Sequence, residues 1–357
     1  MGVGAAGVIA PAMAIIAVLY PPEERASAIA TFAVFGAAGL AIGPVMGGLL
    51  LDHFWWGSIF LVNVPLVVAG VIVGMVVIPE SRKRDARRLD VIGALMSVLG
   101  LGAFLFGVIG GPDPGWLDPA VIAGLVVGIG LIVAFVRREL HSHAPLFDVR
   151  ILRRRAVAAG SITLFTSYGL LTGMLFLFPS WLQDAQGASI LTVGLLLVPF
   201  AVVFGVMSLE STGIVRRLGA HDAIVGGLLV SALAMVLLGL FVHDETVFSV
   251  VATVVLGVGL AQLIAPPSTV VMNALPEEEA GDGSSLNMVS RFVGAAISVA
   301  VLGSVFATVQ SHRLDAGDSA ARAFDAGARA GYWVAAAVAV LAAVWAWRSL
   351  RPRVPSP

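Results

Sequence analysis

The chain has 357 residues, of which 59% are hydrophobic and only 12% are charged, and its mean hydropathy is +0.98. Soluble domains carry roughly 25% charged residues, so this composition excludes an ordinary soluble protein and predicts a membrane protein. The formal net charge is -1 and cysteine is absent, which excludes disulfides, thiolate metal sites and cysteine nucleophiles.

Eleven segments lack Asp, Glu, Lys and Arg and are long enough to cross a bilayer, whose core of about 30 Å needs roughly 20 apolar residues in a helix. They are residues 1–22, 26–51, 53–79, 91–112, 119–136, 156–183, 185–209, 223–243, 246–276, 292–312 and 330–347. Continuous apolar runs satisfy their backbone hydrogen bonds in lipid only as helices, and they lack the alternation of a membrane barrel. We therefore expect an all-α, polytopic membrane protein with about eleven transmembrane helices.

The connections between these segments alternate in charge. Basic clusters occur at 81–88, 137–155, 216–219 and 348–353, whereas the intervening connections are acidic. The exception is a longer connection before the last span, in which we expect Arg313, Arg322 and Arg329 to lie. By the positive-inside rule the basic set is cytoplasmic, which predicts a cytoplasmic C-terminus and places Met1 outside. The first 20 residues lack the basic start of a signal peptide and lead directly to another span, so we expect them to form a membrane helix.

The second span contains the pattern G-x-x-x-G-P-x-x-G-G, formed by Gly39, Gly43, Pro44, Gly47 and Gly48. Glycines four residues apart share one helix face and allow another helix to approach closely. Pro44 has no backbone N–H and its ring pushes on the preceding turn, so a bend is expected. Such a helix is suited to rocking against a partner, and the alternative is simple tight packing.

This stretch resembles the antiporter motif in the fifth helix of drug:proton antiporters of the major facilitator superfamily. Further segments resemble parts of the same family in the same order, namely 1–11, 25–30, 60–66, 78–81, 89–96, 110–116, 181–199 and 274–303. The segments 89–96 and 110–116 resemble the two additional helices of its fourteen-helix branch. The resemblance implies a helical bundle that exports drugs in exchange for protons by alternating access.

Relative to that family, the chain is expected to lack the first three helices, which carry a membrane carboxylate and the gating loop. All 22 acidic residues and all six histidines fall in connections or at span ends, so the sequence has no obvious proton carrier. Glu210 is the nearest candidate for proton coupling, and the alternative is a helix-end carboxylate beside Arg216 and Arg217. The segment 213–219 resembles a degenerate gating-loop motif with Arg216 at the position of the family's aspartate.

A cavity for amphipathic or cationic compounds is expected to offer aromatic rings and neutral polar groups. Phe165 and Tyr168 are candidates, with packing against lipid or neighbouring helices as the alternative. Gln262 precedes a double proline that breaks the helix, which makes it a cavity or hinge candidate; the alternative is a hydrogen bond between helices. Asn63, two residues before a proline, is a similar candidate. Arg291 is expected to reach the headgroups or to pair with the acidic loop 277–282.

The sequence contains no metal-ligand cluster, nucleotide loop or nucleophile–base pair, so we expect no enzyme, no cofactor, no metal and no nucleic-acid partner. The expected partners are a small-molecule substrate, protons and the lipid bilayer, with the protein acting as a monomer in the cell membrane. The expected parts are a remainder of an N-terminal bundle (1–80), two linker helices (81–155), a C-terminal six-helix bundle (156–348) and a cytoplasmic tail (349–357).

Two other functions remain open at this point. The chain could be a truncated product that does not transport, or a membrane interaction partner. It could also be a dedicated exporter of one endogenous metabolite, which the sequence does not separate from multidrug export.

Overall fold

The computed structural model describes residues 15, 19, 36, 39, 42–43, 45–77, 90–113, 115–141, 149–241, 246–276 and 279–351. Within these residues every regular element is helical, which confirms the all-α prediction. Eight helices in this part of the chain are long and apolar enough to cross a membrane. Most of the first predicted span, and Pro44 with its predicted bend, lie outside the described residues.

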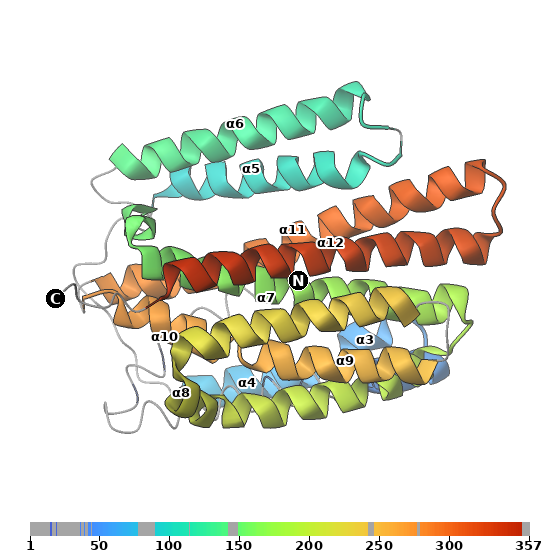
Figure 1. Cartoon of the computed structure of the whole chain (residues 1–357), viewed down its shortest axis with the longest axis horizontal. Coiled ribbons are helices and arrows are strands. Elements are labelled where there is room, and N and C mark those ends of the chain that lie inside the picture. Colours follow the sequence, from blue (N-terminus) through green and yellow to red (C-terminus); the bar gives the residue numbers. More distant parts are fainter. Residues whose placement is uncertain are drawn as a thin grey trace. The chain divides into compact units, whose positions relative to one another are not determined.

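Residues 45–53 are helical and precede the labelled elements. These elements are α3 (Ser58–Leu61), α4 (Asn63–Val77), α5 (Val91–Gly110), α6 (Pro119–His141), the 3₁₀-helix η1 (Val149–Arg153), α7 (Arg155–Ser180), the π-helix η2 (Trp181–Ala185), α8 (Ile190–Phe241), α9 (Thr246–Ala261), α10 (Ala265–Asn273), α11 (Ala280–Asp315) and α12 (Ala320–Ser349) (Figure 1). Contacts group the chain into two units, Met1–Ala86 with Ser189–Gly205 and Arg87–Ala188 with Val206–Pro357.

Helix α8 contains both of the predicted spans 185–209 and 223–243 almost entirely. Its helical geometry is interrupted at Gly219, where φ is 85° and ψ is 158°. Glycine adopts a positive φ without a steric penalty, so the chain turns here between two helical segments. The basic connection predicted at 216–219 is therefore a sharp kink at one residue.

The predicted span 246–276 is divided into α9 and α10. Residues 262–264 form a turn between them, and Pro266 and Pro267 lie in the first turn of α10. Proline is tolerated in the first turn because the N–H groups there have no intrahelical partner. The structure thus shows the break that the double proline predicts.

The last two helices are longer than their apolar runs. The sequence places Arg313, Arg322 and Arg329 in a long connection, but α11 continues to Asp315 and α12 begins at Ala320. That placement is wrong because helices continue beyond the apolar run wherever their backbone hydrogen bonds can still form. Only residues 316–319 connect the two helices, and Gly317 has a φ of 89° there.

Helices α5 and α6 form an antiparallel hairpin and lie side by side along their length (Figure 1). Glycines form the seam between them: a Cβ added at Gly128 would lie 2.4 Å from the backbone nitrogen of Phe104, and one added at Gly107 would lie 2.8 Å from that of Leu125. Small residues at such a seam let the backbones approach closely, which increases dispersion contacts in lipid. The hairpin therefore packs through its backbone.

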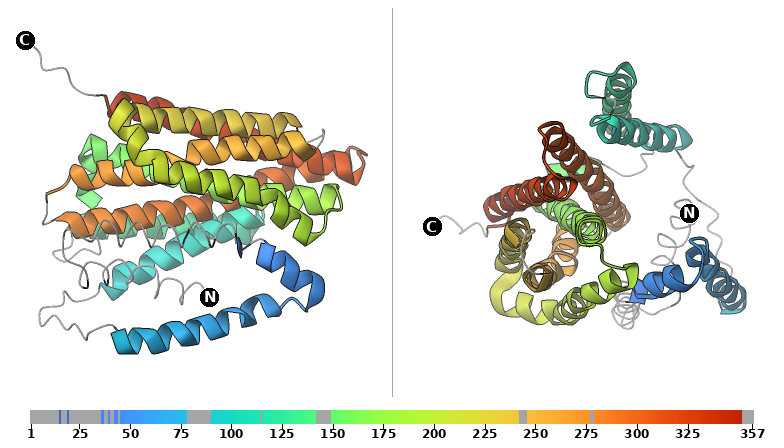
Figure 2. Two further views of the ribbon diagram at one scale, coloured as in Figure 1. Left: turned by 90° about the horizontal axis from the view of Figure 1, so that it is seen from below. Right: turned by 90° about the vertical axis from the view of Figure 1, so that its right-hand side faces the viewer.

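In the second unit, which also contains the α5–α6 hairpin, α7 packs against α11 and α12. Helices α11 and α12 also pack against each other (Figures 1 and 2). Trp181 and Tyr332 are among the largest fully buried side chains. The indole N–H of Trp181 donates to Asp325 Oδ1 over 3.2 Å and so ties the end of α7 to α12. These helices carry Phe165 and Tyr168, on α7, and Arg291, on α11.

Candidate transport site

In the first unit, the glycine-rich stretch meets α8 at Gly48. Gly48 is buried, and a Cβ added to it would lie 2.6 Å from Leu191 Cα and 2.9 Å from Leu191 N. No described atom lies within 4 Å of a Cβ added at Gly39, Gly43 or Gly47. The close approach that the glycines predict is therefore present at Gly48, and it joins backbone to backbone.

Asn63 begins α4 and is exposed. Its side-chain nitrogen donates to the carbonyl oxygen of Ile59 over 3.0 Å, so the amide bonds to the preceding turn of its own chain. The described contacts give Asn63 a local role at this turn. Its role in a substrate cavity stays a prediction.

A second glycine seam joins α7 to α11. A Cβ added at Gly294 would come within 2.2 Å of the carbonyl oxygen of Phe165, and the Ser298 hydroxyl donates to the carbonyl oxygen of Gly169 over 2.7 Å. Thr172 adds a longer contact of 3.3 Å to the carbonyl oxygen of Ala295. These contacts hold the two helices in one register.

An apolar pocket of about 150 Å³ lies between α7, α11 and α12. Its walls include Phe165 on α7, Val301 on α11 and Val338 on α12. Pockets for drug-sized ligands are about 300–1,000 Å³, so this one has room for an alkyl or aryl group of a larger molecule. Phe165 thus lines a pocket, as one of the predicted alternatives requires, whereas Tyr168 is not among the residues around it.

Tyr168 instead lies beneath the guanidinium group of Arg291. The Arg291 Cζ atom is 5.3 Å from the ring centroid, within the range of a cation–π contact. A terminal nitrogen of Arg291 donates to the Ser268 hydroxyl over 2.7 Å. Glu279 of the acidic loop 277–282 pairs with Arg154 over 3.0 Å, and none of the described acids of this loop pairs with Arg291; residues 277 and 278 lie outside the described residues.

Gln262 lies in the turn between α9 and α10 and is only 7% exposed. Neither its side-chain nitrogen nor its oxygen has a hydrogen-bond partner among the described residues. A buried amide without partners costs free energy, about 1–3 kcal/mol for each unpaired group. This observation supports the prediction of a polar cavity or hinge position more than the alternative of a hydrogen bond between helices.

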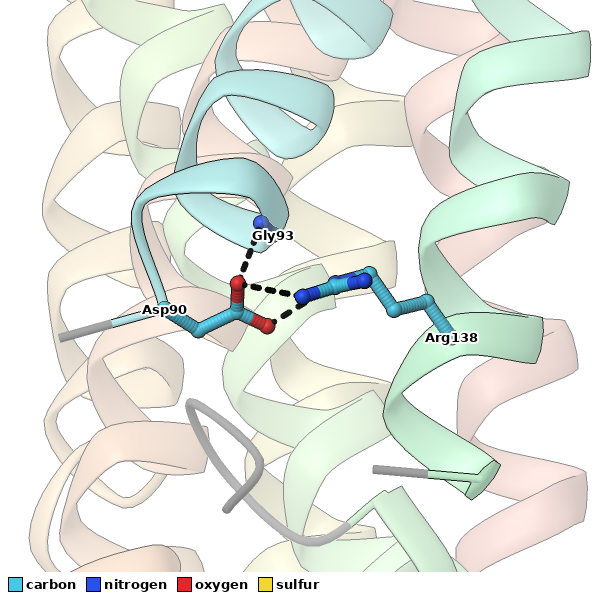
Figure 3. A network of polar contacts seen from close by, with 3 residues as sticks. All are labelled: Asp90, Gly93 and Arg138. Atoms are coloured by element: carbon cyan, nitrogen blue, oxygen red, sulfur yellow. Dashed lines mark hydrogen bonds and ion pairs between the residues drawn. The ribbon is translucent and has the colours of Figure 1, made fainter. Parts of the chain in front are cut away.

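An ion pair closes the open end of the α5–α6 hairpin. Asp90 accepts hydrogen bonds from Arg138 Nε over 3.0 Å and from an Arg138 terminal nitrogen over 2.9 Å (Figure 3). Asp90 Oδ1 also accepts from the backbone N–H of Gly93 over 2.9 Å and so caps α5. The hydrogen bonds from Arg138, followed by the one from Gly93, hold the pKa of Asp90 below its ordinary value.

Comparison with known proteins decides the family. The sequence profile of the Major Facilitator Superfamily matches residues 1–299. The chain belongs to the Major Facilitator Superfamily. It is accordingly a multi-pass membrane protein of a transporter family and not a member of an enzyme family.

Within this superfamily, several similar proteins are known by function. Multidrug resistance protein Stp of Mycobacterium tuberculosis is 32% identical over 315 residues, which cover 88% of this chain and 59% of Stp. Multidrug efflux pump LfrA of Mycolicibacterium smegmatis is 30% identical, with 82% of this chain and 58% of LfrA covered. Lincomycin resistance protein LmrB of Bacillus subtilis is 26% identical over 83% of this chain and 62% of LmrB. The chain thus spans less than two thirds of the length of these relatives.

Two solved structures share the superfamily fold with this chain. A bacterial homolog of the human lysosomal transporter Spinster, in an inward-facing and occupied conformation, has a TM-score of 0.58 at 16% identity. An auto-inhibited POT family peptide transporter has a TM-score of 0.60 at 17% identity. Each comparison covers 97% of this chain and 75% of the other. At these identities the likeness concerns the fold alone.

Acidic side chains are of special interest in a superfamily transporter because ionisable groups in spans commonly mark ion pathways. Glu210 is exposed on α8, and its carboxylate lies near Gly213: a Cβ added there would be 3.8 Å from Glu210 Oε2. Among the described residues it forms no ion pair with Arg216 or Arg217. Both readings, a proton carrier and a helix-end carboxylate beside these arginines, stay predictions.

One acid that sequence reasoning missed is Glu139, which is 1% exposed in the last turn of α6. A Cβ added at Gly93 would lie 3.0 Å from Glu139 Oε1, so this carboxylate lies against the start of α5. Glu139 follows the seam residue Gly128 by eleven residues, close to three helical turns, and therefore shares its face. The spacing of the inward-facing residues of α6 could have revealed this position. Continued past the last apolar residue of the helix, that spacing places Glu139 on the same face.

Replacing Asp90 with asparagine is expected to weaken the hairpin. Asparagine still caps a helix, so the change removes mainly the charged pairing with Arg138. The pKa of Asp90 is lowered in the folded protein, so its stabilisation is complete above the unfolded value of about 3.9 and is lost as pH falls through the folded value. We expect a lower Tm for the variant at every pH from 5 to 8, with the difference shrinking below about pH 4.

The matched control is Asp118→Asn. Asp118 caps α6 through a hydrogen bond of 2.8 Å from the backbone N–H of Ala120, and no arginine pairing of Asp118 is seen among the described residues. The two variants are compared by thermal unfolding of the purified proteins in detergent, at pH 5 to 8 and below about pH 4. Equal Tm losses, or a difference that grows in acid, would contradict the assigned role of the ion pair.

Proposed function

We propose that this chain acts in the export of small amphipathic or cationic compounds across the cell membrane, driven by protons and working by alternating access. Its partners in this proposal are the small-molecule substrate, protons and the lipid bilayer, and it acts as a monomer with a cytoplasmic C-terminus. The expected division into 1–80, 81–155, 156–348 and 349–357 is part of the same proposal.

The observation that carries the proposal is the backbone contact between Gly48 and Leu191. A helix face without side chains has no interlocking knobs, so two helices that meet through it can change their angle at little steric cost. The multidrug relatives named above support export as the direction and drugs as the substrate class. Gln262 and Phe165 remain candidate substrate contacts, the first as an unpaired buried amide and the second as part of an apolar pocket.

The proposal is tested in inside-out membrane vesicles that contain the 357-residue chain. A pH gradient, acidic inside, is imposed and uptake of the cationic dye rhodamine 123 is followed by its fluorescence. Uptake above that of vesicles without the protein, and its collapse when a protonophore removes the gradient, are the expected results. Vesicles that contain folded protein but take up no dye would favour the non-transporting alternative.

Glu210→Gln tests the candidate proton carrier in the same vesicles. If Glu210 carries the proton, the pH gradient should no longer drive uptake, whereas exchange of external for internal dye without a gradient should persist. We expect a loss of about tenfold or more in gradient-driven uptake, since an uncharged amide cannot be protonated in this role. Unchanged gradient-driven uptake would exclude Glu210 as the carrier.

Substrate range separates a multidrug exporter from a dedicated exporter of one metabolite. Several chemically unrelated cationic dyes should compete with rhodamine 123 for uptake if the cavity is broad. Uptake of rhodamine 123 that none of them reduces would favour a dedicated exporter.

A further inference from the structure

The charge of Arg291 has no obvious counterpart in the structure. No Asp or Glu in the described part of the chain lies within ion-pair distance of it, although Arg138, Arg154 and Arg313 each pair with a carboxylate. An arginine has five N–H donors, and among the described residues only the Ser268 hydroxyl accepts one of them. The Nε atom of Arg291 is buried and has no hydrogen-bond partner there.

The position of Arg291 along the bundle makes this unusual. It follows Ala280, the first residue of α11, by eleven residues, and at about 1.5 Å per residue it lies about 16 Å along the helix. Its guanidinium group is directed at the ring of Tyr168, which lies thirteen residues, or about 20 Å, beyond the start of α7. A charged side chain inside a membrane span costs free energy. A group that binds it there is therefore expected to belong to the function of the protein.

The surroundings hold the guanidinium group in place before any ligand binds. Beside the close approach at Gly294, the hydrogen bond from the Ser298 hydroxyl to the carbonyl oxygen of Gly169 holds α11 against α7 and so sets the position of Tyr168 beneath the charge. Ser268 donates its own hydroxyl hydrogen to the carbonyl oxygen of Ile264 over 2.9 Å and accepts from Arg291. Because Ser268 is occupied in both roles, it orients the arginine and leaves the other donors available.

A second unpaired polar group lies on the same face of α11. Asn287 precedes Arg291 by four residues, is 8% exposed and has an Oδ1 atom without a hydrogen-bond partner among the described residues. Residues four apart on a helix are neighbours on its surface. The arginine and the amide therefore form one polar position on this face of α11.

We propose that Arg291, oriented by Tyr168 and Ser268, is an oxyanion-binding site for a carboxylate or phosphate group. Guanidinium groups bind these anions through paired N–H donors, and the aromatic ring beneath leaves the edge of the guanidinium free to do so. The inference rests on the proposed function and refines its substrate class: amphipathic compounds that carry an anionic group, zwitterions included, should bind more tightly than cationic compounds without one. The oxyanion can belong to the transported compound or to a lipid headgroup, and the experiment separates these sources.

The test is an equilibrium binding measurement on the purified 357-residue chain in a neutral detergent. The probes are rhodamine 110, which carries a free carboxylate, and rhodamine 123, its methyl ester, and fluorescence anisotropy reports their binding. We expect rhodamine 110 to bind about tenfold more tightly than its ester, and Arg291→Gln to remove this preference by weakening rhodamine 110 alone. Arg291→Lys keeps the charge but not the paired donors, so an intermediate preference is expected.

Arg313→Gln is the matched control, because Arg313 lies on the same helix, is exposed and pairs with Asp318 over 3.4 Å. It should leave the affinity for both dyes within about twofold of the unchanged protein. If Arg291→Gln and Arg291→Lys both lost affinity for the two dyes to the same extent, Arg291 would have a structural role and the proposal would be overturned. Binding of both dyes with equal affinity by the unchanged protein would overturn it as well.

Competition with short-chain lipids identifies the source of the oxyanion. Dihexanoylphosphatidylglycerol, which has a net negative charge, is compared with the zwitterionic dihexanoylphosphatidylcholine as a competitor of rhodamine 110. Both lipids carry a phosphate oxyanion, so displacement by phosphatidylglycerol, alone or together with phosphatidylcholine, assigns the site to a lipid headgroup. Displacement by neither assigns it to the transported compound. Because binding is measured without a gradient, a failure of transport in vesicles leaves this result intact, and the two proposals can fail separately.

Discussion

Gly294→Ala is expected to destabilise the second unit, which consists of Arg87–Ala188 and Val206–Pro357. The loss of stability should be larger than for any other glycine-to-alanine change discussed. The new Cβ would lie 2.2 Å from the carbonyl oxygen of Phe165 and 2.8 Å from its Cα and carbonyl carbon. These are backbone atoms of α7, so no side-chain rotation relieves the overlap and the two helices must separate. Overpacking of this kind costs about 1–3 kcal/mol. The purified variant should unfold at a lower temperature in detergent than the unchanged protein.

Gly303→Ala on the same helix is the control for this prediction. Its added Cβ would lie 3.5 Å from the ring of Phe176, an ordinary contact distance. Alanine favours a helix over glycine by about 1 kcal/mol, so this variant should be as stable as the unchanged protein or more so. If the two variants had the same Tm, the seam between α7 and α11 would not be the reason for the glycine at 294. Separation of the helices should also change the distance from Arg291 to Tyr168, so the rhodamine 110 preference should fall with the stability.

Gly48→Ala is expected to impair transport. Its Cβ would lie 2.6 Å from Leu191 Cα and 3.1 Å from the carbonyl oxygen of Ile190, so α8 must move away from the glycine-rich stretch. If one conformation of the transport cycle carries this contact and another does not, a penalty of about 1–3 kcal/mol shifts their equilibrium roughly 5- to 150-fold. Uptake of rhodamine 123 by inside-out vesicles should fall accordingly while the amount of protein in the membrane stays the same.

Gly47→Ala provides the comparison within the same stretch. No described atom lies within 4 Å of a Cβ added at Gly47, so the methyl group clashes with none of the described residues, and uptake should remain within about twofold of the unchanged protein. Equal losses in both variants would mean that the stretch needs flexibility along its whole length. Full activity of Gly48→Ala would remove the support that the contact with Leu191 gives to the proposed mechanism.

The helical architecture could be predicted from the sequence because lipid leaves the backbone almost no alternative. Apolar length located the cores of α4 to α12, and the double proline at 266 and 267 located the break at residues 262–264. The helix ends could not be predicted in the same way. Charges mark where an apolar run ends, but α11 and α12 continue past Arg313 and start before Arg322, since a helix can extend into water.

Candidate residues were harder to predict than helices because their partners are distant in sequence. Tyr168 and Phe165 are three residues apart on α7, yet the first lies under Arg291 and the second lines an apolar pocket with α11 and α12. The contact of Arg291 with Ser268 joins two helices, and nothing in either segment alone indicates it. Likewise, the spacing of the glycines at 39, 43, 47 and 48 predicts a close approach but not which of them makes it.

The ion pair of Asp90 and Arg138 has a consequence for how such proteins gain and lose helices. It joins the first residue before α5 to the last turn of α6, so the chain enters and leaves the hairpin at almost the same place (Figure 3). A segment whose two ends lie close together can be inserted between existing helices without stretching the chain on either side. The hairpin also supplies its own seam and its own electrostatic closure. It therefore has the properties of a self-contained helical insertion.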